Sequence, residues 1–208
     1  MFISNARLAG GLLAGTTALL LTACGSSSSK PGAAGTSSMS VPPGSSAPAA
    51  ADHNQADVSF ATDMIPHHAQ AVEMADMALK QGSNSQLTQL ARQIKSAQNP
   101  EIVTMSDWLK AWGAPVPATS MSGMNMGGMS MNGMMSAQEM TQLSSAKGAA
   151  FDKLWLQQMI KHHQGAIAMA KTELTTGQYP AATALAQSIS GSQAKEISTM
   201  QNLLSKLG

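Results

Sequence analysis

The chain has 208 residues, a formal net charge of +1 and only 11% charged residues. A near-neutral chain without a basic stripe does not fit a nucleic-acid-binding protein, which needs clustered Lys and Arg to neutralise phosphates. Aromatic residues make up 3% of the sequence, whereas methionine occurs 17 times, and this excess of a soft, polarisable side chain requires an explanation.

The first 23 residues are typical of a lipoprotein signal peptide. Arg7 precedes an apolar run over 8–20, which is shorter than the roughly 18–20 residues that cross a bilayer as a helix. Residues 21–24 are Leu-Thr-Ala-Cys, the form of a lipobox, and Cys24 is the only cysteine. We therefore predict that Cys24 is lipidated and anchors an exported protein to the extracytoplasmic face of the cell membrane. An ordinary cleaved signal peptide before an unmodified Cys24 is the alternative.

The segment that follows Cys24 is dominated by Ser, Gly, Ala and Pro up to residue 51. Such a composition offers too little apolar surface to offset the loss of chain entropy on folding. We therefore predict a flexible tether over 24–51. The remainder, residues 52–208, has the length of one domain.

An internal repeat organises this domain. Segments 60–113 and 155–208 align without a gap at a constant offset of 95 residues, as from His67 to His162. The motifs at the centre of the match are Met64-Ile65-Pro66-His67-His68 and Met159-Ile160-Lys161-His162-His163. A register held over this length indicates duplication, with repeat one over 55–113 and repeat two over 138–208.

Each repeat carries two helical patterns separated by a turn. Apolar residues recur at helical spacing on both sides of Gly82-Ser83-Asn84 and of its counterpart at 177–180, and no alternating strand pattern occurs. Two helical hairpins with apolar stripes bury them against each other, so we predict an all-α, antiparallel four-helix bundle with approximate two-fold symmetry. Pro66 and Pro100 lie inside these patterns and are expected to bend their helices without breaking them.

Two His-His pairs lie on the inner faces of the predicted helices. His68 and His163 fall on the apolar stripes, and the other two histidines lie beside them, near methionines of the same helix. The side chains that two-fold symmetry would gather are Met64, His67, His68, Met74, Met159, His162, His163 and Met169. Imidazole suits several transition metals, and thioether sulfur selects soft ions such as Cu(I). Because methionine precedes each pair where di-iron proteins carry the glutamate of Glu-x-x-His, the pattern favours copper or silver over iron.

Glu101 and Glu196 lie on or beside the inner stripe of the second helix in each repeat, close to Gln98 and Gln193. If metal binds, these carboxylates would orient the imidazoles that hold it. Without metal, a pairing such as His68 with Glu101 would be a satisfied buried network that fixes helix register. The sequence leaves both interpretations open.

A methionine-rich insert over 114–137 separates the repeats. Its seven methionines within fifteen residues are Met121, Met124, Met126, Met129, Met131, Met134 and Met135. Their spacing by Gly, Ser and Asn is incompatible with a packed core or a regular helix, and low-complexity flexibility is the alternative to a function. Thioethers on a mobile backbone can wrap Cu(I) or Ag(I), so we predict metal capture here. Ser136 and Glu139 form a potential capping box that opens the next helix.

The duplicated Met-Ile-x-His-His helix, followed by a Gln-x-x-Glu-Ile helix, resembles the bacterial "domain of unknown function 305" family over most of residues 55–208. The resemblance implies a ferritin-like four-helix bundle, export from the cytoplasm and, for some members, copper or silver binding linked to metal tolerance. The binding residues that it implies are Met64, His67, His68, Met159, His162 and His163. The long methionine-rich insert is not expected in every member, and no enzymatic activity follows from the resemblance.

Three functions are compatible with these features. The leading hypothesis is an envelope-anchored protein that captures Cu(I), and also Ag(I), through Met and His side chains for copper homeostasis or tolerance. A ferritin-like metal oxidase or reductase would in addition need an open coordination position and a substrate path. A structural or interaction lipoprotein would use the same histidines for packing alone. The partners expected under the leading hypothesis are the metal ion and, through the lipid anchor, the membrane.

Overall fold

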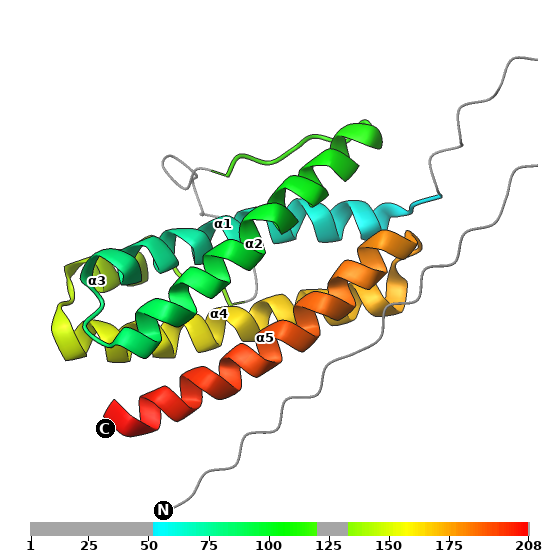
Figure 1. Ribbon diagram of the computed structural model, residues 1–208. Coiled ribbons are helices and arrows are strands. Elements are labelled where there is room, and N and C mark those ends of the chain that lie inside the picture. The colour runs from blue at the N-terminus through cyan, green and yellow to red at the C-terminus, as the bar shows by residue number, and fades with distance from the viewer. Residues whose placement is uncertain (1–51, 120–132, 208) are drawn as a thin grey trace, which may run out of the picture. The chain divides into compact units, whose positions relative to one another are not determined.

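The computed structural model of this chain describes residues 52–119 and 133–207, and the described residues contain helices and connections but no strand. The helices are α1 (Gln55–Gln81), α2 (Ser85–Ala111), α3 (Ala137–Ser145), α4 (Gly148–Thr176) and α5 (Pro180–Leu207) (Figure 1). The predicted signal peptide, Cys24 and the tether lie outside the described residues, as do five methionines of the insert: Met121, Met124, Met126, Met129 and Met131.

The helices form the predicted bundle. α1 packs along α2, and α4 packs along α5, so each repeat is one helical hairpin; α1 also packs against α4 and joins the two hairpins (Figure 1). The prediction of an all-α bundle is therefore confirmed. α3 is a short fifth helix that contacts α4. It begins at the predicted capping box, in which the Glu139 backbone N–H donates to Ser136 Oγ at 3.2 Å and the Ser136 N–H donates to Glu139 Oε2 at 2.7 Å.

Local sequence signals set the helix ends. Asn54 Oδ1 accepts hydrogen bonds from two backbone N–H groups in the first turn of α1, and Asn84 does the same for α2, which satisfies donors that have no partner within the helix. Gly82 caps the C-terminus of α1 and Gly177 that of α4, both in extended conformation. α1 continues through its internal proline, Pro66, and α2 likewise continues through Pro100, so neither proline breaks its helix.

Two buried aspartates connect the repeats reciprocally. The Asp57 carboxylate, in repeat one, accepts hydrogen bonds from the backbone N–H groups of Gln178 and Tyr179 in the α4–α5 turn, at 2.9 to 3.2 Å. Asp152, 95 residues after Asp57, accepts from the Ser83 N–H at 3.0 Å and from the Ser83 hydroxyl in the α1–α2 turn. Ser83 and Gln178 are themselves equivalent positions. Each repeat therefore fixes the turn of the other.

Apolar side chains form two buried clusters at opposite halves of the helices. The Trp155 cluster includes Met74, Leu87, Ile94, Met135, Leu143, Phe151, Trp155, Met159 and Met200. The Phe60 cluster includes Phe60, Met64, Ile65, Met105, Leu109, Ala166 and Ile189. Along α1 the two clusters meet between Ile65 and Ala71, and along α4 between Met159 and Ala166. The two His-His pairs occupy these intervals.

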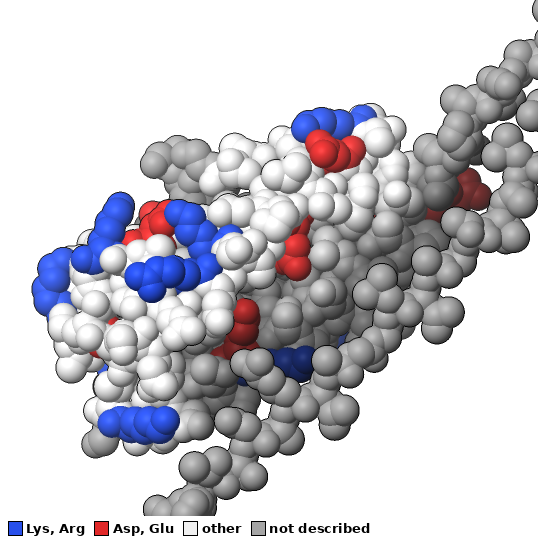
Figure 2. Space-filling model, viewed as in Figure 1, with Lys and Arg blue, Asp and Glu red and all other residues white. Residues whose placement is uncertain are grey.

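None of the helices in the described part of the chain is both long and apolar enough to span a membrane. On the face drawn in Figure 2, the described Lys, Arg, Asp and Glu side chains are interspersed and separated by wide uncharged areas.

Candidate metal centre

A buried polar layer separates the two apolar clusters. Its most buried members, each at most 3% exposed, are His67, His68, Gln98, His162, His163 and Gln193. Each of the four long helices contributes to the layer near its midpoint, and each contribution of repeat one recurs in repeat two. Burying this many polar side chains is costly unless they are hydrogen-bonded or hold a ligand.

His67 and His162 meet at the centre of the layer. Their ring centroids lie 3.7 Å apart, with an angle of 38° between the ring planes. Two imidazoles that bind one ion through nitrogens at about 2.0 Å would hold their ring centres roughly 5–6 Å apart. A single ion shared by this pair would therefore require the rings to separate. The structure brings the two repeats' histidines together, as two-fold symmetry predicts, with their rings tilted against each other rather than placed to chelate one ion.

His68 and His163 are each held by a glutamate of the neighbouring helix. His68 Nε2 lies 2.8 Å from Glu101 Oε2, and His163 Nε2 lies 2.7 Å from Glu196 Oε2. An ionised carboxylate only accepts hydrogen bonds, so in a neutral ring Nε2 carries the proton and Nδ1 carries the lone pair. Nδ1 of both rings is buried and has no hydrogen-bond partner among the described residues.

His162 is electrostatically suited to remain neutral. Its pKa lies well below the ordinary value of 6.5, first because burial penalises the charged ring and then because the other three histidines of the layer would repel a positive charge. Both of its ring nitrogens are buried, and a hydrogen bond to the His67 backbone, which acts to raise the pKa, does not outweigh these effects. A neutral imidazole with an unshared lone pair is the form that binds metal.

The structure divides the four predicted bundle methionines between the two sides of the layer. Met64 and Met159 are fully buried, Met64 in the Phe60 cluster and Met159 in the Trp155 cluster together with Met74. Met169 packs against the Phe60 cluster and lines a pocket of about 200 Å³ with Glu173. Each side of the layer thus receives one thioether from each repeat, and the four sulfur atoms do not gather at one point.

Within residues 52–119 and 133–207, no group of three or more His, Cys, Asp and Glu side chains is arranged to hold a metal ion. A site built from the described residues therefore depends on thioether donors or on movement of the histidine rings. Thioether donors would favour a soft ion, whereas imidazole alone suits several transition metals.

The end of the insert lies inside the bundle, contrary to the expectation that none of it packs in a core. Met135 is 1% exposed and belongs to the Trp155 cluster, whereas Met134 is partly exposed. Two hydrogen bonds from Gln70 hold the Met135 backbone in place. Sequence patterns gave no sign of this contact because its partners lie 65 residues apart.

A second buried group that the sequence analysis did not identify is a carboxyl pair formed by Asp57 and Glu173. Glu173 is 1% exposed, and burial, followed by the proximity of Asp57, raises its pKa to about 8. Burial acts to raise the pKa of Asp57 as well, but hydrogen bonds from Asn54, Glu173 and the α4–α5 turn outweigh it and lower that pKa. Ala78 occupies the position of Glu173 in repeat one, so this break in the repeat was the available signal.

Comparisons with known proteins agree with this architecture. The model of the family described as "Domain of unknown function (DUF305)" matches residues 57–204. A DUF305 protein from Streptomyces coelicolor is 34% identical, with 74% of this chain and 94% of that chain covered and a TM-score of 0.65. A DUF305 fragment from Deinococcus radiodurans is 31% identical over 74% of this chain and 97% of its own, with a TM-score of 0.64.

A third relative of known structure is CopM in its Cu(I)-bound form, which is 34% identical over 72% of this chain and 96% of its own, with a TM-score of 0.60. CopM has also been solved in Cu(II)-bound and Ag-bound forms. A comparison with curated protein sequences finds no match. From the extent of the family match and the shared fold, this chain belongs to the DUF305 family.

Proposed function

We propose that this protein captures Cu(I), and Ag(I) when it is present, through imidazole and thioether groups, as an exported and lipid-anchored component of copper homeostasis or tolerance. The observation that carries the proposal is the pair of buried Nδ1 atoms on His68 and His163, which have no hydrogen-bond partner among the described residues. An unsatisfied buried acceptor costs about 1–3 kcal/mol. Two of them at repeat-related positions are well explained as metal ligands.

The glutamates add to this argument. Glu101 and Glu196 lie partly exposed at the edge of the layer and fix each imidazole through Nε2. Metal-binding histidines commonly donate their other ring N–H to a carboxylate, which sets the tautomer and makes the ligand nitrogen more basic. The same contacts would serve a register-fixing network, but such a network does not need the opposite nitrogen to stay unpaired.

The donor types support a coinage-metal ion as cargo. Met64 precedes His68 by one helical turn, and Met159 precedes His163 by the same interval, so each repeat offers sulfur beside nitrogen. The Cu(I), Cu(II) and Ag forms of CopM show that a relative with this fold binds such ions. The methionines of the insert would increase the number of metal ions that the protein binds. A lipid on Cys24 would keep the protein at the membrane surface, where it would encounter copper outside the cytoplasm.

Competition for Cu(I) against a chromogenic chelator tests the proposal. Replacing His68 and His163 with Gln keeps an N–H donor for each glutamate while it removes the Nδ1 lone pair, so we expect loss of the tightest Cu(I)-binding phase with little change in fold. Replacing all four histidines of the layer should have at least that effect. The matched control is His53→Gln, because His53 stacks on Trp112 at 4.5 Å and lies outside the layer. Unchanged Cu(I) affinity in the His68/His163 variant, with circular dichroism like that of the parent, would contradict the proposal.

A further inference from the structure

A three-residue segment at the end of the methionine-rich insert crosses from α4 to α1 beside the polar layer. At one end, Gly133 has φ +84°, and a Cβ placed on it would lie 2.7 Å from Lys161 O and 2.9 Å from Gly165 Cα. The backbone of the segment thus touches α4 on both sides of His162. Only glycine fits at position 133, because the positive φ and the close approach both disfavour a side chain.

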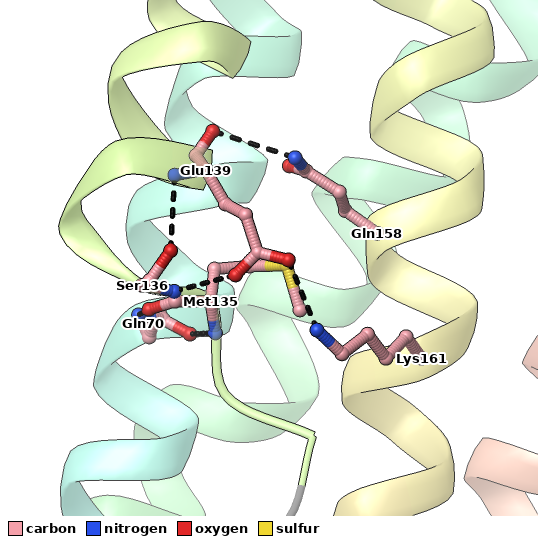
Figure 3. Close-up of polar contacts among 6 residues, drawn as sticks. All are labelled: Gln70, Met135, Ser136, Glu139, Gln158 and Lys161. Atoms are coloured by element: carbon pink, nitrogen blue, oxygen red, sulfur yellow. Dashed lines mark hydrogen bonds and ion pairs between the residues drawn. The ribbon is translucent and has the colours of Figure 1, made fainter.

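At the other end of this segment, the side-chain amide of Gln70 makes two hydrogen bonds with the backbone of Met135. Gln70 Nε2 donates to Met135 O at 2.8 Å, and the Met135 N–H donates to Gln70 Oε1 at 2.7 Å (Figure 3). Gln70 is 1% exposed and follows His67 by three residues. Its repeat-related position is Gly165, the residue that Gly133 touches. The segment therefore spans two equivalent positions, each one helical turn beyond a histidine of the central pair.

The asymmetry between Gln70 and Gly165 indicates a dedicated function. If a buried glutamine were part of the common scaffold, the second repeat would carry one as well. Gln70 instead has a small counterpart, against which the segment packs, and both the N–H and the carbonyl of its side-chain amide bond to the Met135 backbone. Burying an amide is justified energetically only when its hydrogen bonds are made, so this residue is specific for holding the segment.

Beyond Met135, the chain is fixed to α4 as well. Glu139 Oε1 accepts a hydrogen bond from Lys161 Nζ at 3.0 Å, and the Glu139 carbonyl oxygen accepts one from Gln158 Nε2 at 3.4 Å (Figure 3). Together with the Gln70 contacts, these bonds attach both sides of Met135 to the bundle. Figure 3 shows the Met135 side chain extending from the segment toward α4.

The Met135 side chain is free of this anchoring, because the contacts with Gln70 use main-chain atoms only. It is 1% exposed and lies in the same buried cluster as Met159, which precedes His162 by three residues on the same helix face. Both ring nitrogens of His162 are buried, and in a neutral imidazole one of them carries a lone pair. Two thioethers and one imidazole are a soft donor set that selects Cu(I).

We propose that Met135 joins Met159 and His162 as a ligand of one Cu(I) ion, and that Gln70 is the positioning residue that seats Met135 there. This inference rests on the copper-binding function proposed above. It makes the end of the insert part of the buried site and assigns that site two sulfur donors, of which one comes from outside the repeats.

The test uses the full chain in a background where Met121, Met124, Met126, Met129 and Met131 are replaced by Ser, so that the insert does not mask the buried site. Met135→Leu keeps the volume and the backbone contacts but removes the sulfur. We expect Cu(I) affinity to fall about 10- to 100-fold, by analogy with the loss of groups that support metal ligands, and X-ray absorption at one copper equivalent to show one sulfur scatterer fewer. The matched control is Met200→Leu, which changes an equally buried methionine of the same cluster on α5 and should alter neither quantity.

Gln70→Ala tests the positioning role. We expect it to lower Cu(I) affinity about tenfold and to have no further effect when combined with Met135→Leu, because Gln70 acts only through Met135. Additive losses in the double variant would overturn the role of Gln70, and Met135→Leu behaving like Met200→Leu would overturn Met135 as a ligand. If those variants are silent while the histidine variants still lose Cu(I), this inference alone fails. If the parent itself binds no Cu(I), the proposed function fails instead.

Discussion

The free energy of unfolding is expected to fall as the pH rises toward 9, because Glu173 must then ionise inside the bundle. The Glu173 pKa is raised from 4.5 to about 8 in the folded protein. The folded state therefore binds this proton more tightly than the unfolded state does. Stability from Glu173 is fully present below about pH 4.5, is lost progressively as the pH rises, and is gone above the folded pKa of about 8. We expect a total loss on the order of 2 kcal/mol, less than the full shift implies, because the titrations of Glu173 and the neighbouring Asp57 are coupled.

Urea unfolding of the metal-free protein at several pH values measures this effect, and the comparison with Glu173→Gln isolates it. The amide of that variant can still donate to Asp57 but does not titrate, so the variant should match the parent near pH 5 and be more stable than the parent at pH 9. Using the difference cancels the titration of His162, whose lowered pKa destabilises the folded state in acid. Glu73→Gln, on the exposed face of α1, serves as control and should leave the pH profile unchanged. A profile of Glu173→Gln parallel to that of the parent up to pH 9 would show that the buried pair does not hold a proton.

Removal of the Asp152 carboxylate is expected to destabilise the protein by about 3 kcal/mol. Asp152 is 1% exposed and accepts hydrogen bonds from both the N–H and the hydroxyl of Ser83. Asp152→Ala leaves these donors of the α1–α2 turn buried or poorly solvated, and the loss of charged hydrogen bonds of this kind costs about 1.5–3 kcal/mol each in the usual case. Chemical denaturation should show the loss as a lower midpoint at an unchanged slope.

The control for Asp152→Ala is Asp76→Ala, which removes a carboxylate from a partly exposed ion pair with Lys95. Such pairs contribute about 0–1 kcal/mol. Hydrogen exchange adds a local reading, since the Ser83 amide should lose protection in Asp152→Ala while amides of the α4–α5 turn keep theirs. Equal effects of Asp152→Ala and Asp76→Ala would mean that the reciprocal contacts between the repeats do not stabilise the fold.

The candidate centre combines a symmetric part, formed by the histidine–glutamate pairs, with an asymmetric part, formed by Met135. The two hairpins carry equivalent imidazole–glutamate pairs, His68 with Glu101 and His163 with Glu196. The insert adds Met135 on one side only. Two-fold symmetry alone would give the same set of side chains on both sides of the layer. The position of Met135 on one side is the feature that would make the two sides different.

Much of this organisation follows from local sequence signals. The constant offset of 95 residues predicts a duplication, and helical spacing placed His68 and His163 on buried faces, because a residue's position relative to an apolar stripe reports which way its side chain points. Caps such as Ser136 were recognisable since their partners lie within one turn. The pairing of His68 with Glu101 was also foreseeable as one of two alternatives, because a hairpin of known turn length sets which residues of its helices are opposite.

Contacts between repeats depended on the tertiary structure. The sequence by itself determined the helices and the buried faces on which the histidines lie, because each of these depends on neighbours within a turn or a hairpin. Only the folded bundle decided that the rings of His67 and His162 lie against each other, that Asp57 lies close enough to raise the pKa of Glu173, and that Gln70 holds the end of the insert. These partners lie 65 to 116 residues apart in the chain, and no periodicity specifies them, since they arise from how two hairpins and a connecting segment pack in three dimensions.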